Sequence, residues 1–165
     1  MSGACGANRQ HRTVVDFAEY RMRMRAGVPS AQRAYYLVGL THAVRHGAAD
    51  RALRRSLADA IRAREPHAVV HDPVETWYRA SAPNGTDRVE EFHRLTDLAA
   101  GSQVCVAVLP TRESVADAAA ELRAAHGGGA VVVAITGETD DFLVRAFATT
   151  VLPDLSAFTD WVRAA

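Results

Sequence analysis

Short apolar runs alternate with longer helical patterns through most of the chain, and this alternation restricts the fold more than any other feature. The apolar runs have the length and composition of buried strands. They are Tyr35–Leu40, Val69–Asp72, Val104–Leu109, Ala130–Ile135 and Thr149–Leu152. The helical patterns cover residues 50–64, 87–100, 114–126, 140–146 and 154–164. Strands separated by helices predict a parallel sheet with helices on both faces.

Five such strands in a chain of 165 residues predict one α/β domain with a three-layer, flavodoxin-like sheet of strand order 2-1-3-4-5. We expect this domain to cover residues 12–165, with an additional N-terminal helix over residues 12–26. Residues 1–11 are mostly polar or glycine, and we expect them to be disordered. The expected helix caps are Asp50, Thr86, Ser114 and Asp154.

Composition argues against several classes of function. The 19 basic and 19 acidic residues balance, which disfavours nucleic acid as a partner. Every basic residue is arginine, so there is no P-loop lysine, Schiff-base lysine or Ser-Lys dyad. Cys5 and Cys105 form no C-x-x-C pair, and the histidines have no metal-binding spacing. Without a signal-peptide pattern or an apolar run of about 18 residues, we expect a cytoplasmic protein with no membrane partner.

The stretch from Val104 to Gly129 combines the most apolar strand with an alanine-rich helix that contains the acid Glu121. Ser114 and Asp117 have the spacing of a capping box, and Gly127–Gly129 is expected to end the helix rather than hold a phosphate. In a sheet of this type, ligands bind at the carboxyl ends of the strands, near the point where the strand order reverses. Residues 39–42 and 109–114 are therefore expected to flank a site.

Two carboxylates stand near this site. Asp97 lies late in the helix that precedes the most apolar strand, and Glu121 lies in the helix that follows it. A pair of carboxylates is the minimal equipment for glycosidic chemistry. The alternative, which spacing alone favours, is that both are solvated acids on helix surfaces.

The order of these features resembles the nucleoside 2-deoxyribosyltransferases and the related nucleotide N-glycosidases, over about residues 35–162. The chain has a first strand ending in Gly39, then Asp97-Leu98, then the strand Val104–Ala107, then Ser114 and Glu121. Gly129 follows Glu121 by eight residues and precedes Val131–Val133, as in that family. The segment His71–Trp77 is similar to the one after the second strand in the cytidylate-type members.

The resemblance implies roles for several residues. Glu121 would attack or stabilise the anomeric carbon, Asp97 would hydrogen-bond the sugar or base, and Tyr36 would orient Glu121 and help to keep it ionised. The base would stack near Trp77, and Gly39 would let the sugar or phosphate approach the main chain. Binding of a 5′-phosphate is expected at His42, Arg45 or the helix start at Ser114, and Asp117 is a further substrate-binding candidate.

The resemblance also implies no metal or organic cofactor, a nucleoside or nucleotide as the small-molecule partner, and a homodimer or higher homo-oligomer. Hydrolysis and transfer to a second base both remain open. One alternative is a catalytically altered nucleotide-binding or interaction domain. It is favoured by Asp117 and Thr150, which stand where the family usually has a glycine and an asparagine, and by a turn after the first strand that differs from the family's. Another is a flavodoxin-like regulatory domain, although the chain lacks the acidic cluster and lysine of a phospho-receiver.

Overall fold

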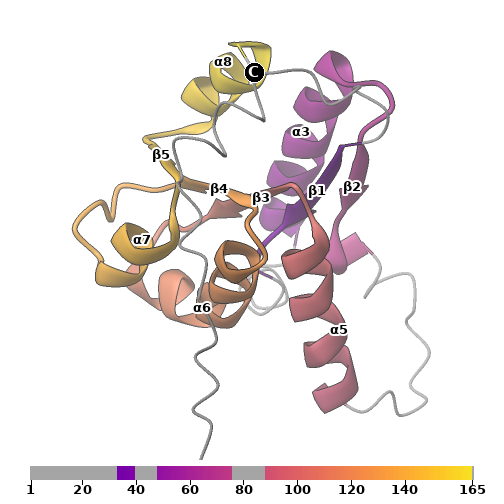
Figure 1. Cartoon of the computed structure of the whole chain (residues 1–165). Helices are drawn as coiled ribbons and strands as arrows, with labels where there is room; N and C mark the ends of the chain where they lie inside the picture. The colour runs from indigo at the N-terminus through magenta and orange to yellow at the C-terminus, as the bar shows by residue number, and fades with distance from the viewer. Residues whose placement is uncertain (1–32, 40–47, 76–87, 165) are drawn as a thin grey trace, which may run out of the picture. The chain divides into compact units, whose positions relative to one another are not determined.

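A computed structural model describes residues 33–39, 48–75 and 88–164, and within these ranges the chain forms a five-stranded sheet flanked by helices (Figure 1). The strands are β1 (Ala34–Leu37), β2 (Val69–His71), β3 (Val104–Val108), β4 (Val131–Ile135) and β5 (Thr150–Leu152). The helices in these ranges include α3 (Ala48–Arg64), α5 (Arg88–Gly101), α6 (Arg112–Gly127), α7 (Phe142–Phe147) and α8 (Leu155–Ala164). The expected disordered N-terminus, the expected helix over residues 12–26 and the expected cap Thr86 lie outside the described residues.

All neighbouring strands are parallel, and their order is β2-β1-β3-β4-β5. This confirms the three-layer, flavodoxin-like α/β fold that the alternating pattern predicts. The strand order reverses between β1 and β3, where Tyr36 lies beside Cys105 in the register of the sheet. That point is therefore where a ligand site is expected in this fold.

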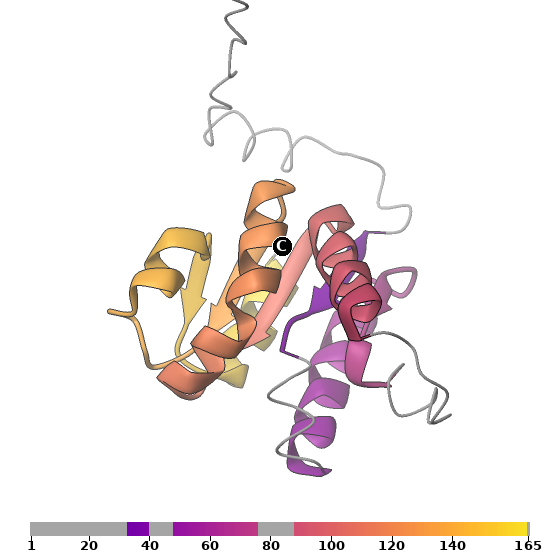
Figure 2. The same cartoon turned by 90° about the horizontal axis from the view of Figure 1, so that it is seen from below.

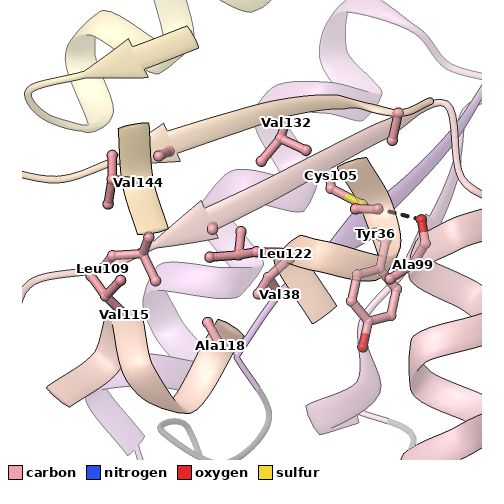
Figure 3. Packing of buried hydrophobic residues seen from close by; sticks show 14 residues of the cluster. Tyr36, Val38, Ala99, Cys105, Leu109, Val115, Ala118, Leu122, Val132 and Val144 are labelled. Atoms are coloured by element: carbon pink, nitrogen blue, oxygen red, sulfur yellow. Dashed lines mark hydrogen bonds between the residues drawn. The ribbon is translucent and has the colours of Figure 1, made fainter. Parts of the chain in front are cut away.

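The two faces of the sheet bury two separate apolar clusters, because successive side chains of a strand point to opposite faces. Tyr36 and Val38 lie in the cluster beneath α5, α6 and α7, whereas Tyr35 and Leu37 lie in the cluster beneath α3 and α8. In Figure 2, α5 and α6 lie side by side on the near face of the sheet. Figure 3 shows the first of these clusters, in which the ring of Tyr36 lies near Cys105 and Ala99.

The start of α6 differs from the expectation. The helix begins at Arg112 and its N-cap is Thr111, not Ser114. Thr111 has extended backbone angles, and its hydroxyl accepts a hydrogen bond from the Ser114 N–H, while the Ser114 hydroxyl accepts one from the Thr111 N–H. Ser114 therefore closes the capping box from inside the helix.

The other expected caps have mixed outcomes. The prediction for Asp50 was wrong, because α3 begins at Ala48 and Asp50 lies in its first turn. The Asp154 carboxylate accepts a hydrogen bond of 2.9 Å from the Ala157 N–H, which confirms its capping role.

The three glycines Gly127–Gly129 end α6, as expected, and Gly127 is its last residue. Gly128 is the C-cap, and its N–H donates to the Ala124 carbonyl. Gly129 has a φ of +83°, a left-handed conformation that favours glycine. A Cβ on Gly128 would lie 2.1 Å from the carbonyl oxygen of Ala100, so only glycine lets the end of α6 approach α5 so closely.

Candidate functional site

Glu121 is the buried carboxylate around which the site is built. It lies on α6 with only 7% of its surface exposed. The Tyr36 hydroxyl donates a hydrogen bond to its Oε1, and the Gly39 N–H donates one of 2.9 Å to its Oε2. Both donors belong to β1 or to the residues directly after it. The carboxylate is therefore held at the carboxyl end of β1, where the strand order reverses.

The backbone at Gly39 makes the second of these bonds possible. Val38 still follows the sheet, because its N–H donates to the Val106 carbonyl of β3. Gly39 then has a φ of +102°, a backbone angle that residues other than glycine rarely adopt. In this conformation the Gly39 N–H donates to the Glu121 carboxylate.

Burial controls the protonation of both partners. The pKa of Glu121 is raised above 4.5, chiefly because burial removes water, although the bonds from Tyr36 and Gly39 and the charge of Arg54 lower it. The Tyr36 hydroxyl thus opposes the rise, as expected, but burial outweighs it. Burial and the nearby Glu121 charge also raise the pKa of Tyr36 far above its usual value, so its hydroxyl keeps its proton and remains a donor.

Arg54 is a site residue that the sequence analysis missed. Its guanidinium Nε lies 2.9 Å from Asp72 Oδ1, and its Nη1 and Nη2 donate to the carbonyls of Val38 and Leu37 at 2.9 and 2.6 Å. Arg54 is only 5% exposed, although arginines are normally found at the protein surface. A signal was present: Arg54 precedes the buried Leu57 by three residues and so falls on the apolar stripe of α3.

Asp97 has a different environment from the one expected. It is exposed on α5, about half a helical turn away from the buried Leu95 and Ala99. In the described ranges, no hydrogen bond or ion pair joins Asp97 to Glu121. The structure therefore does not show the two carboxylates as a contacting pair.

Asp97 instead lines a cavity of about 300 Å³ between α5 and the edge strand β2. The other lining residues are His71, Arg94, Leu98, Gly101 and Ser102. His71 is beside Tyr36 in the register of β1 and β2, so its side chain points to the same face of the sheet as the Tyr36 ring. The cavity thus lies on the face of the sheet that also carries Glu121.

The remaining expected site residues have varied positions. Ser114 is buried, and its hydroxyl is engaged with Thr111, to whose carbonyl it donates at 2.6 Å. Asp117 is half-buried on α6, one helical turn before Glu121 and on the same side of the helix. Arg45, His42 and Trp77 lie outside the described residues.

Two general properties complete the description. Among the residues whose placement is described, no group of three or more histidine, cysteine, aspartate and glutamate side chains is arranged to hold a metal ion. Over the same ranges, no helix has the length and apolar character needed to cross a membrane.

Comparisons with known proteins bear on the fold. No protein-family profile matches the chain, and no curated protein matches it. Among solved structures, a conserved protein from Enterococcus faecalis V583 is similar with a TM-score of 0.60 and 17% identity, over 81% of this chain and 99% of that one. A 2-deoxyribosyltransferase from Bacillus psychrosaccharolyticus is similar with a TM-score of 0.56 and 14% identity, over 80% of this chain and 91% of that one. The chain therefore has a nucleoside deoxyribosyltransferase-like fold.

Proposed function

We propose that this protein cleaves or transfers the N-glycosidic bond of a nucleoside or nucleoside 5′-monophosphate, with Glu121 as the nucleophile. The observation that carries the proposal is the Glu121 carboxylate itself, buried at the carboxyl end of β1 and held through both oxygens. A buried carboxylate with fixed donors is costly for stability, and such groups concentrate at functional sites. The likeness to a 2-deoxyribosyltransferase supports the choice of chemistry.

The proposed reaction has two steps. A Glu121 carboxylate oxygen forms a bond to the anomeric carbon while the bond from that carbon to the base breaks, and the base leaves with the bonding electrons and takes up a proton. Water or a second base then attacks the same carbon, loses a proton and releases the Glu121 carboxylate. The carboxylate stabilises the positive charge that develops on the sugar in both transition states.

Tyr36 and Gly39 orient the nucleophile in this scheme. Each donates to one carboxylate oxygen, and each oxygen retains a lone pair for the sugar carbon. The two bonds also favour the ionised form that the attack requires, against the effect of burial. Activity is thus expected to rise with pH as Glu121 loses its proton.

For substrate binding, we assign Asp97 to the sugar or base through the cavity that it lines with His71. Trp77 is proposed to stack on the base, and His42 to contact a 5′-phosphate. Ser114 is a weaker candidate for that phosphate, because its hydroxyl is engaged in the cap of α6.

The test is release of free base, measured by chromatography over a panel of purine and pyrimidine nucleosides and 5′-monophosphates. Wild-type protein is expected to release base from at least one member, and Glu121→Gln to lose about 10³-fold or more in rate. Glu113→Gln, an exposed carboxylate on the same helix, is the matched control and should retain the rate. No release from any substrate, or full activity in Glu121→Gln, would refute the proposal. Adding a free second base shows whether water or the base is the acceptor.

A second candidate is a domain that binds a nucleotide without cleaving it. Asp117 favours this candidate, because a half-buried carboxylate one turn before Glu121 adds negative charge to the same side of α6. Calorimetric binding of a nucleoside or nucleotide with no base release over the same panel would identify this function.

We also propose that the protein forms at least a dimer. Val89 and Phe92, one turn apart on α5, are 60% and 50% exposed, and apolar pairs of this kind are common in subunit contacts. Light scattering is expected to give at least twice the mass of one chain, and a monomer at all concentrations would contradict this assignment.

A further inference from the structure

We infer that Arg54 is a positioning residue for Glu121, and that it acts through the single peptide unit that joins Val38 to Gly39. The guanidinium holds the carbonyl end of this unit, and the Glu121 carboxylate accepts from its N–H end. The inference rests on the proposed function, because it gives Glu121 the role of nucleophile. Beyond that function, we infer that Arg54 orients the nucleophile and that Asp72 holds Arg54 in place.

The planar peptide unit between Val38 and Gly39 links the two hydrogen bonds. In a trans peptide unit the C=O and the N–H are coplanar and point in opposite directions. Arg54 Nη1 donates to the Val38 oxygen at 2.9 Å, and the Gly39 nitrogen of the same unit donates to Glu121 Oε2 at 2.9 Å. Fixing the carbonyl therefore fixes the direction of the N–H. The restraint on the N–H direction matters because Gly39 has a φ of +102°, and glycine has unusual backbone freedom.

The guanidinium is itself held firmly. Nη2 donates to the Leu37 carbonyl at 2.6 Å, and Nε pairs with Asp72 Oδ1 at 2.9 Å. Asp72 directly follows β2, so one side chain of α3 ties together the ends of β1 and β2. Arginine suits this task because its donors form a rigid planar fork, whereas lysine offers one flexible ammonium group.

The positive charge of Arg54 also acts on Glu121. A cation at the carbonyl and an anion at the N–H both strengthen the polarisation of the peptide unit between them. Among the described residues, the charged and titratable groups around Glu121 include Tyr36 from β1, Arg54 from α3 and Cys105 from β3, with Asp117 one turn before it on α6. Tyr36 and Cys105 are both neutral, since burial raises their pKa values, that of Cys105 to about 12. Arg54 is thus the cation among these groups, and it lowers the pKa of Glu121.

The test is an NMR titration of Glu121 in protein labelled with ¹³C at the glutamate carboxyl carbons, with the resonance assigned by Glu121→Gln. Arg54→Gln is expected to raise the pKa of Glu121 and to shrink the pH-dependent shift of the Gly39 amide. Arg55→Gln, the exposed neighbour on the same helix, removes the same charge and should change neither. An unchanged pKa and an unchanged Gly39 shift in folded Arg54→Gln would overturn the inference.

A second variant covers the case in which Arg54→Gln does not fold. Asp72→Asn keeps an oxygen that can accept from Arg54 and from the Val74 N–H, but it removes the charge that partly neutralises the guanidinium. The pKa of Glu121 is then expected to fall, the opposite of the change in Arg54→Gln. A Glu121 pKa that stays constant or rises in Asp72→Asn would contradict the inference.

Kinetics separate positioning from general folding effects. Where base release is detected, Arg54→Gln should lower kcat about ten- to a hundredfold with KM within about twofold, and Arg54→Lys should recover part of the loss. The acidic limb of its rate profile should move to higher pH together with the titration of Glu121. The titration needs no turnover, so an absence of base release in the wild type would refute the proposed function and leave the test of Arg54 intact.

Discussion

Tyr35 and Tyr36 are adjacent in β1, yet their hydroxyls donate to two carboxylates on opposite faces of the sheet. Tyr35 bonds to Glu65 at 2.9 Å on the side of α3, and Tyr36 bonds to Glu121 on the side of α6. Glu65 is also paired with Arg33 at 2.9 Å, whereas Glu121 has a backbone N–H as its second partner. The same pair of chemical groups thus occurs twice, once with the carboxylate paired to an arginine side chain and once with it bonded to a main-chain N–H in the candidate site.

This symmetry provides a matched pair of variants. Tyr36→Phe removes a hydrogen bond that favours the ionised form of Glu121, so the pKa of Glu121 should rise. We expect the acidic limb of the profile of kcat/KM against pH to shift to higher pH. At pH values below this limb, kcat/KM should fall about ten- to a hundredfold relative to the wild type. Rates measured from about pH 5 to 9 test this shift.

Tyr35→Phe is the control, because it removes the same hydroxyl from the other face. In the wild type, burial raises the pKa of the Tyr35 hydroxyl to about 12, and this hydroxyl contacts Glu65 instead of the candidate site. The variant should lose some stability but keep the pH profile of the wild type. Identical profiles for Tyr36→Phe and the wild type would remove Tyr36 from the mechanism.

The raised pKa of Glu121 also predicts how stability depends on pH. The folded protein holds the Glu121 proton more tightly than the unfolded chain, in which the pKa is near 4.5. The contribution of this group is therefore complete below about pH 4.5 and is lost as the pH rises through the folded pKa. The free energy of unfolding of the wild type, minus that of Glu121→Gln, should decrease over this window. Denaturant titrations at successive pH values measure it, and an increase with pH would show a depressed pKa.

Asp97 is expected to affect binding more than chemistry. It is exposed and lines the cavity beside β2 without a bond to Glu121. We expect Asp97→Asn to raise KM by about tenfold and to leave kcat within about twofold. Glu90→Gln, an exposed carboxylate near the start of the same helix, should change neither constant. A loss confined to kcat would instead place Asp97 at the reacting atoms.

The close approach of α5 and α6 provides a stability test. Gly128→Ala would place a methyl group 2.1 Å from the Ala100 oxygen, which is backbone and cannot rotate away. We expect a loss of about 2 kcal/mol or more in the free energy of unfolding. Gly127→Ala has no atom within 4 Å of the new methyl group and should be neutral or stabilise by up to about 1 kcal/mol. Thermal melts of both variants test the difference, and equal melting temperatures would contradict it.

The sheet was predictable because its signals are local. Val104–Val108 and Val131–Ile135 are apolar enough to identify as buried strands, and the helices between strands determine that the sheet is parallel. The start of α6 was misjudged because Thr111 and Ser114 each satisfy the pattern of a cap, and only the backbone angles distinguish them. Short-range patterns thus gave the elements, with errors of a few residues at their ends.

The site was less predictable because its contacts join distant parts of the chain. The Tyr36–Glu121 bond spans 85 residues, and the sequence suggested it only through the resemblance to a family. Arg54 was missed because an arginine is normally placed in solvent, and two of its three partners are main-chain carbonyls that no sequence pattern marks. Asp97 faces away from the buried residues of α5 because its phase on the helix differs from theirs.

The missing methyl group at Gly128 also has a consequence for motion. The backbone there is packed against the carbonyl of Ala100, so the end of α6 and the end of α5 have no space in which to slide past one another. These two helix ends are therefore expected to move together. We therefore expect the cavity that Asp97 lines, which lies next to Ala100, to keep its shape when a ligand binds.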